Sequence, residues 1–147
     1  MCKKLMQTEN DTGLLVLRVL LGLVFFPHGA QKVLGWFGGF GFHGTMDYFT
    51  TQMGIPWIFA LLAILAEFLG SLGLIVGLFT RVAAFGIACE MVVAVWMVHL
   101  PHGFFMNWFG KQAGEGFEYH ILVIAMCLVL LLKGGGMFSL DRAFGKE

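Results

Sequence analysis

Four ionisable side chains lie within or at the edge of long apolar stretches of the sequence. Arg18, Glu67 and Glu90 each have apolar neighbours on both sides, and Lys32 lies near the end of the first stretch. A charge at the centre of a membrane-spanning helix costs about 2.5–3.5 kcal/mol on insertion scales, so it needs a partner or a wet cavity. We therefore expect Arg18, Lys32, Glu67 and Glu90 to form an intramembrane polar cluster.

Helical spacing places the two cations of the first stretch on one face. Arg18, Gly22, Gly29 and Lys32 follow one another at intervals that share a helical stripe. The glycines on that stripe would let a second helix approach closely. At the rise of an α-helix, Arg18 is predicted to lie on the cytoplasmic side of the membrane centre and Lys32 on the outer side.

The two carboxylates raise a question of charge. If Glu67 and Glu90 face one interior they repel each other, so one of them is protonated or paired with Arg18 or Lys32. Two uses of such a cluster stay open. It could form a functional cavity, or it could consist of interhelical salt bridges that only hold the helices together.

The histidines form a second candidate cluster, at the outer mouth of the predicted bundle. His99 and His102 have a spacing typical of metal ligands, but Pro101 breaks the helix between them and no third ligand has a fixed spacing. We therefore predict no metal site. Histidines that hydrogen-bond water or loop carbonyls are the alternative. The residues assigned to this mouth are His28, His99, His102, Glu118 and His120.

Composition requires that lipid cover most of the chain. The 147 residues are 59% hydrophobic and only 12% charged, with a mean hydropathy of +0.84, whereas soluble domains carry about 25% charged residues. The sequence predicts a single all-α domain over residues 1–147, a four-helix bundle in the membrane. The spans are expected at about 14–34, 57–79, 81–100 and 117–133.

The placement of lysine and arginine predicts the orientation. The positive-inside rule favours the arrangement with both termini in the cytoplasm, as a multi-pass protein of the inner (plasma) membrane. With that arrangement, the cytoplasmic side holds Lys3, Lys4, Arg81, Lys133, Arg142 and Lys146, and the outer side holds Lys32 and Lys111. Formal net charge is +0, so no basic surface for nucleic acid is expected.

The first outer loop is rich in glycine and aromatic residues. Residues 35–56 are too apolar to extend freely into water, and we expect them to lie on the outer leaflet with a short helix over about 45–52. Trp36, Trp57, Trp96 and Trp108 all fall in the outer half, as in an aromatic belt at one interface.

Several segments in this order resemble the DoxX family of small four-helix membrane proteins. The resemblance runs over about residues 14–142 and is carried by LRVLLGLVFFPHGAQKVLGWFGG, the stretch 44–84, VHLPHGFF, the Glu118 region and GGGMFSLDR. It implies an inner-membrane protein linked, in some relatives, to redox complexes. Glu90 is not part of the family pattern. The positions onto which that pattern carries over are Arg18, Gly22, Gly29, Lys32, Glu67, Gly77, Arg81 and Glu118.

Two functions follow as hypotheses. The first is an accessory or quinone-interacting membrane subunit of a redox system, with a quinone as the candidate cofactor and a soluble oxidoreductase as the candidate partner. If the chain is an enzyme at all, it would be such a subunit, because it has no Gly-rich nucleotide loop or nucleophile–base set. The second is a non-enzymatic membrane scaffold or small-solute carrier with structural intramembrane salt bridges, in which a homo-oligomer could complete the assembly.

Cysteine usage argues against a dithiol enzyme within one chain. Cys2, Cys89 and Cys127 form no C-x-x-C pair, and the last two lie inside apolar runs. Buried thiols in such surroundings are chemically inert.

Overall fold

The computed structural model describes residues 5–145, and these form helices with no β-strand among them. Predictions that involve Cys2, Lys3, Lys4 and Lys146 lie outside the described residues. Four helices make up the body of the protein: α2 (Thr12–Leu34), α4 (Trp57–Val76), α5 (Thr80–Ala94) and α6 (Glu118–Lys133). The shorter elements are η1 (Trp36–Gly38), α3 (Gly41–Asp47), η2 (Tyr48–Gln52), η3 (Val95–His99), η4 (Leu100–His102) and α7 (Leu140–Phe144).

Three helical segments of the described chain are long and apolar enough to cross a membrane. They are Thr12–Leu34, Trp57–Val76 and Thr80–His102, the last formed by α5 continuing through η3 and η4. The fourth predicted span forms a helix, but α6 has 16 residues, which is about 24 Å of rise. A fourth crossing therefore stays a prediction.

Helix ends differ from the predicted bounds where side chains or glycines cap them. α2 begins at Thr12 because the Asp11 carboxylate accepts a hydrogen bond from the Leu14 N–H at 2.9 Å. α4 ends at Val76, three residues earlier than predicted, because Gly77 adopts a left-handed conformation with φ of 71°.

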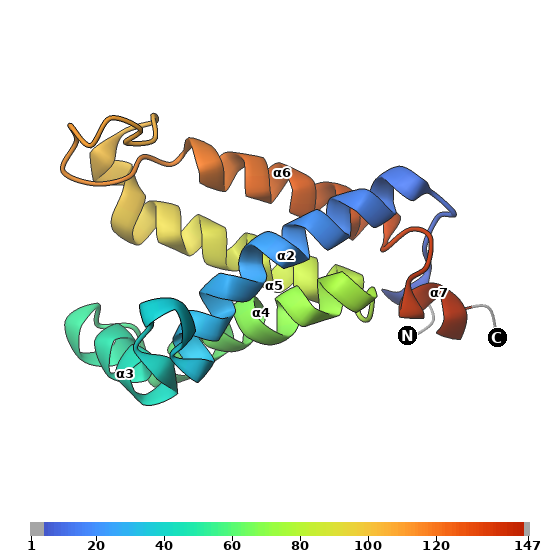
Figure 1. Ribbon diagram of the computed structural model, residues 1–147, viewed down its shortest axis with the longest axis horizontal. Helices are drawn as coiled ribbons and strands as arrows, with labels where there is room; N and C mark the ends of the chain where they lie inside the picture. Colours follow the sequence, from blue (N-terminus) through green and yellow to red (C-terminus); the bar gives the residue numbers. More distant parts are fainter. Residues whose placement is uncertain (1–4, 146–147) are drawn as a thin grey trace.

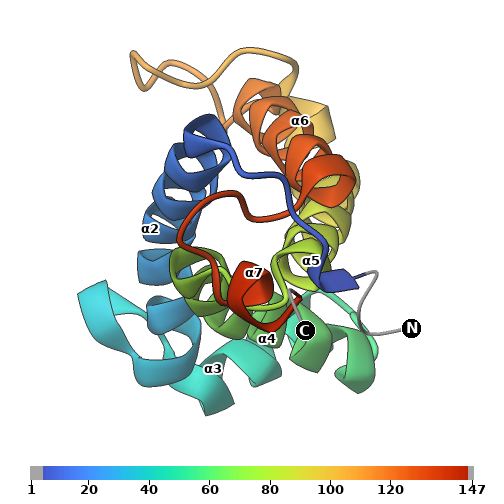
Figure 2. The same ribbon diagram turned by 90° about the vertical axis from the view of Figure 1, so that its right-hand side faces the viewer.

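The helices enclose one long core. Figure 1 shows α4 and α5 side by side, with α2 crossing α4 and α6 running beside α5; Figure 2 shows the same four helices end-on. On α2, a Cβ at Gly29 would lie 2.6 Å from the Phe68 Cα, and one at Gly22 would lie 2.8 Å from the Ser71 carbonyl oxygen. The predicted close approach of a second helix to this stripe is confirmed, and that helix is α4.

Large apolar side chains also cover the outside of the bundle. Leu20, Leu62, Phe85 and Leu132 are each more than half exposed. Surfaces of this kind are rare on soluble monomers and are expected where hydrocarbon surrounds the helices.

The two ends of the bundle are built differently. Both ends of the described chain lie at one end, where α7 packs, while α3 and the loop 103–117 lie at the other (Figure 1). The predicted short helix in the first outer loop is present and starts earlier, at Gly41. Its Met46 packs with Ala60 and Ile64 of α4 in a small core of its own. All four tryptophans are exposed.

Candidate functional site

An ion pair joins α2 to α4 inside the bundle. The Lys32 ammonium donates a hydrogen bond to the Glu67 carboxylate; the side chains are 23% and 7% exposed, respectively. Gly29 makes this reach feasible, because it lies one turn before Lys32 where the two helix backbones touch. Of the partners left open by the sequence, Lys32 is the one that pairs with Glu67.

Two further polar side chains reach the same place from the other two helices. The charged groups that face Glu90 of α5 are Glu67 and Lys32. The Tyr119 side chain of α6 lies close enough to Glu67 to be influenced by its charge. Among the described residues, Glu90 Oε2 and the Tyr119 hydroxyl are buried and have no hydrogen-bond partner. We call Lys32, Glu67, Glu90 and Tyr119 the interior polar cluster; each of the four main helices contributes one member.

Tyr119 was not among the residues predicted for this cluster. It follows Glu118 at the start of the last helix, where aromatic residues usually mark a membrane interface. Tyr119 shares no recognisable helical spacing with other polar residues, so the sequence alone does not indicate that its hydroxyl is buried.

Arg18 lies apart from the interior polar cluster, at the end of the bundle that holds the termini. Its side chain is almost fully buried, and its guanidinium donates only to backbone carbonyls. Arg18 and Lys32 are 14 residues apart, which corresponds to about 21 Å of helix, and they bind different groups of α4. The acceptors are Gly135 at 2.7 Å, Leu74 at 2.8 Å, Ile75 at 2.6 Å, Met137 at 3.3 Å and Phe138 at 2.9 Å.

The partners of Arg18 follow from how α4 ends. The last carbonyls of a helix have no partner within the helix, and two of those of α4 point at Arg18. The chain after α6 turns back to the same place and supplies the others. A multidentate donor with a fixed planar fork suits such a ring of carbonyls.

Asp141 completes this end and was not singled out from the sequence. Its carboxylate accepts hydrogen bonds from the backbone N–H groups of Phe79 at 2.7 Å and Thr80 at 2.8 Å, which open α5. Asp141 is buried. It acts as an N-terminal cap for α5 supplied from 61 residues away, a distance at which sequence patterns of capping give no signal.

The outer-mouth residues are only partly brought together. The His99 and His120 rings lie 4.0 Å apart between centroids, and His99 Nδ1 is 2.8 Å from the Glu115 carbonyl oxygen. His102 packs against Gly114 in the loop, while His28 is exposed on α2. Within residues 5–145, no three histidine, cysteine or carboxylate side chains are arranged to hold a metal ion.

Glu118 holds the second outer loop in place. Its Oε1 accepts hydrogen bonds from the Met106 N–H at 3.0 Å and from the Trp108 indole N–H at 3.3 Å. Glu118 therefore fixes the loop that covers this end of the bundle.

A long groove runs along the outside of α4 and α5. Its volume is about 1070 Å³, and it extends from Pro56 to Phe79 with walls of leucine, valine, alanine and glycine. Among the described residues that line it, Glu90 alone is charged, and Cys89 lies beside it. Glu90 thus belongs both to this lipid-facing groove and to the interior polar cluster. A carboxyl group in that position can hold a proton at the boundary between the two.

Buried charges inside an all-helical bundle with an apolar exterior define a membrane protein. The chain belongs to the DoxX family, whose family model matches residues 13–100. Glu118 and the GGGMFSLDR segment lie beyond the matched residues.

Similarity to individual proteins extends further along the chain. It is 28% identical over 142 residues to "Inner membrane protein YqjF" of Escherichia coli, covering 97% of this chain and 99% of that protein. It is 28% identical over 136 residues to "Putative oxidoreductase CatD" of Bacillus subtilis, covering 92% and 90%. An uncharacterised protein of Haemophilus influenzae is 33% identical over 131 residues, covering 89% and 90%. No solved structure matches the chain significantly.

Proposed function

We propose that this protein is a quinone-binding accessory subunit of a membrane redox system, with the α4–α5 groove as the binding site. The observation that carries the proposal is the double position of Glu90. It is the one charged residue on the groove wall, and it faces Glu67 and Lys32 in the interior. A ligand lying in the groove would therefore contact a single carboxyl group, and that group could exchange protons with the interior polar cluster.

The groove fits an isoprenoid quinone in size and chemistry. Small-molecule sites are mostly apolar concavities of about 300–1,000 Å³ with a few polar groups that fix orientation. The apolar walls suit the ring and tail, and Glu90 supplies a carboxyl group on the wall toward which a quinone oxygen can be oriented. When bound, a quinone supplies two-electron, two-proton redox chemistry.

The residues of the chain would manage the protons. Glu90 holds a proton at its carboxyl group on the groove wall. The Lys32–Glu67 pair lies on the interior side of Glu90 and is the next group that can exchange a proton with it. The Tyr119 hydroxyl of α6 lies near Glu67 and has no hydrogen-bond partner among the described residues, so it is a further group on which a proton can be held. Burial excludes bulk water from this path, so each transfer passes between named side chains.

Electrons would come from a partner. The sequence has no glycine-rich nucleotide loop and no cysteine cluster, so we propose that a soluble oxidoreductase carries the electron-donating group. The name of the Bacillus subtilis relative, which contains the word oxidoreductase, agrees with a redox role.

We propose four crossings of the inner membrane with both termini in the cytoplasm. The positions of the chain ends at one end of the bundle support an even number of crossings (Figure 1). At that same end lie Arg81, Lys133 and Arg142, while Lys111 lies in the loop at the other. α6 would cross as the shortest of the four helices.

The test is whether quinone co-purifies and depends on Glu90. The full chain, extracted from membranes in mild detergent, is expected to retain close to one quinone per chain, measured by solvent extraction and mass spectrometry. Glu90→Leu should lose most of it. Glu118→Gln is the control because it removes a carboxylate outside the groove, and it should retain the quinone.

Cys89 offers an independent readout in the same preparation. Because it lines the groove beside Glu90 and is exposed, added quinone should slow its reaction with a maleimide in a Cys2→Ser background. A groove filled instead by phospholipid chains or by a second copy of the protein would contradict the proposal, as would equal quinone content in Glu90→Leu and the unmodified protein.

The proton role is tested separately with Glu67→Gln. With the oxidoreductase partner present, this variant should keep its bound quinone and lose quinone reduction. Normal reduction in the variant would remove Glu67 from the path.

A second candidate function is a non-enzymatic scaffold or small-solute carrier. The Arg18 hydrogen bonds and the Lys32–Glu67 pair favour it to the extent that both join helices to one another. Co-purification separates the two functions: a stoichiometric oxidoreductase supports the redox role, while a lone homo-oligomer without quinone supports the scaffold.

A further inference from the structure

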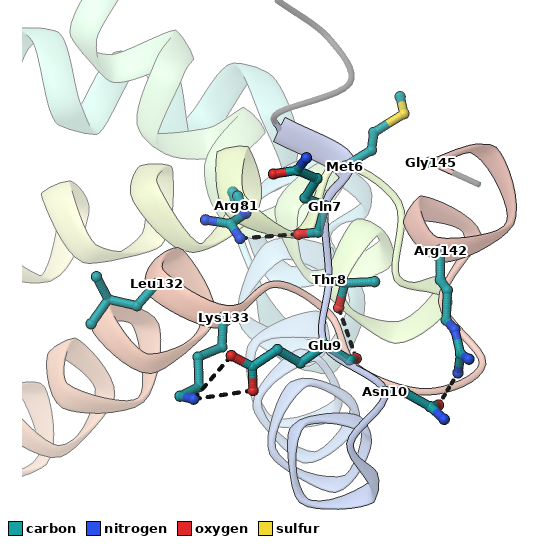
Figure 3. A pocket seen from close by; sticks show the side chains of 10 residues that line it. All are labelled: Met6, Gln7, Thr8, Glu9, Asn10, Arg81, Leu132, Lys133, Arg142 and Gly145. Atoms are coloured by element: carbon teal, nitrogen blue, oxygen red, sulfur yellow. Dashed lines mark hydrogen bonds and ion pairs between the residues drawn. The ribbon is translucent and has the colours of Figure 1, made fainter. Parts of the chain in front are cut away.

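A polar pocket, distinct from the α4–α5 groove, lies at the end of the bundle that holds the chain termini. Its volume is about 550 Å³, and it is formed by residues 6–10 together with the ends of three helices. Figure 3 shows Arg81 and Lys133 on one side of the segment 6–10 and Arg142 on the other. Among residues 5–145, three cationic side chains and one carboxylate, that of Glu9, line this terminal pocket, which gives these residues a net double positive charge.

Two of these cations have no anionic partner within residues 5–145. The Arg81 guanidinium donates to the carbonyl oxygens of Leu131 and Gln7, the latter at 3.0 Å, and Arg142 donates to the Asn10 amide. These acceptors are all neutral, so both positive charges stay uncompensated. Arg81 Nε is in addition buried with no hydrogen-bond partner among the described residues.

The third cation is paired only weakly. Lys133 Nζ lies 3.0 Å from both carboxylate oxygens of Glu9, and the two side chains are 52% and 56% exposed. Exposed pairs of this kind contribute between about 0 and 1 kcal/mol. A stronger anion could therefore share Lys133 at little cost.

The pocket opens next to the lipid-facing surface. Leu132 forms part of its wall and is 77% exposed, and Phe138 and Phe144 are exposed at the same end of the bundle. A ligand in the terminal pocket thus meets cations at one side and hydrocarbon at the other.

We infer that the terminal pocket binds the phosphate headgroup of an anionic phospholipid. The uncompensated guanidinium groups supply the charge and the planar donors that phosphate oxygens accept. The neighbouring apolar side chains favour a lipid over free inorganic phosphate. Basic pockets at the cytoplasmic ends of membrane helices bind such headgroups in the same way, with about 1 kcal/mol for each basic residue near the surface.

The test is a lipid titration followed by native mass spectrometry. The full chain is delipidated in detergent and titrated with phosphatidylglycerol or with phosphatidylcholine of the same acyl chains. We expect phosphatidylglycerol to bind at least tenfold more tightly. Arg142→Gln should weaken phosphatidylglycerol binding about fivefold, which is the equivalent of 1 kcal/mol. Lys111→Gln makes the same charge change at the opposite end and should have no effect.

A variant of opposite sign separates binding from folding. Glu9→Gln removes the one carboxylate that the described part of the chain contributes to the terminal pocket. It should tighten phosphatidylglycerol binding severalfold, a change that a misfolded protein would not produce. Equal affinity for the two lipids, or equal losses in Arg142→Gln and Lys111→Gln, would overturn the inference. Displacement of phosphatidylglycerol by equimolar inorganic phosphate would overturn the lipid as the ligand.

Discussion

Glu67 on α4 is held by Lys32 on α2, in an ion pair where the glutamate side chain is 7% exposed. The pair forms directly beyond the closest contact between these helices, at Gly29. One charge from each helix therefore neutralises the other in the apolar interior. The stability of the bundle should depend on the pair more than on any single surface charge.

Removing one partner of this pair should be costly. In Lys32→Met the Glu67 carboxylate loses its counterion in a buried position, and such changes cost about 3–5 kcal/mol; because Lys32 is partly exposed, we expect a value near 3 kcal/mol. Thermal unfolding in detergent gives the measurement. The double variant Lys32→Met/Glu67→Leu should recover part of the loss, and Lys111→Met should change nothing. A Lys32→Met protein as stable as the original would contradict the stabilising role assigned to this ion pair.

Replacing Arg18 by lysine should weaken the packing of the tail, residues 135–145, against the bundle. An ammonium has three donors, whereas the guanidinium of Arg18 makes five hydrogen bonds to carbonyls. Each lost bond costs about 1 kcal/mol, so Arg18→Lys should lose roughly 2 kcal/mol. Hydrogen exchange of residues 135–145 should rise in the variant, while that of α6 should stay close to the original. Unchanged protection of the tail would contradict the role assigned to Arg18.

Two helical glycines should respond in opposite ways to alanine. A Cβ at Gly29 would lie 2.6 Å from the Phe68 Cα and force α2 away from α4, whereas a Cβ at Gly70 would meet nothing closer than 3.6 Å. Gly29→Ala should therefore cost about 1–3 kcal/mol. Gly70→Ala should be neutral or stabilising by up to about 1 kcal/mol. The midpoint of thermal unfolding distinguishes the two, and equal midpoints would show that α2 and α4 separate freely.

The proposed topology is open to a labelling test. In a background in which Cys2, Cys89 and Cys127 are replaced by serine, Lys111→Cys should react with a membrane-impermeant maleimide in intact spheroplasts. Ala143→Cys, which is also exposed, should react only after the membrane is opened. Labelling of both sites from outside would contradict an even number of crossings.

The spans and their buried charges could be predicted from the sequence because both are local properties. Apolar length marks α2, α4 and α5, and Arg18 and Glu67 stand out against it without knowledge of any partner. The spacing of Gly22, Gly29 and Lys32 also predicted which face of α2 would pack against another helix.

The assignment of partners could not be predicted. Arg18 and Lys32 share a helical face, yet they bind different groups of α4, because α4 ends beside Arg18 and leaves its last carbonyls there, whereas Glu67 lies about two turns earlier. Similarly, Asp141 caps α5 across 61 residues, and Tyr119 turns its hydroxyl inward from a helix end. Each of these contacts depends on where a turn brings the chain back, and no local pattern records that.

The hydrogen bonds from Arg18 to Gly135, Met137 and Phe138 span 117 to 120 residues. During synthesis Arg18 therefore leaves the ribosome more than a hundred residues before these three acceptors. Until they are made, only the Leu74 and Ile75 carbonyls of the five acceptors are available to the guanidinium. Packing of residues 135–138 against Arg18 is therefore a late step in the assembly of the bundle, and variants that disrupt this segment leave part of a buried guanidinium without acceptors.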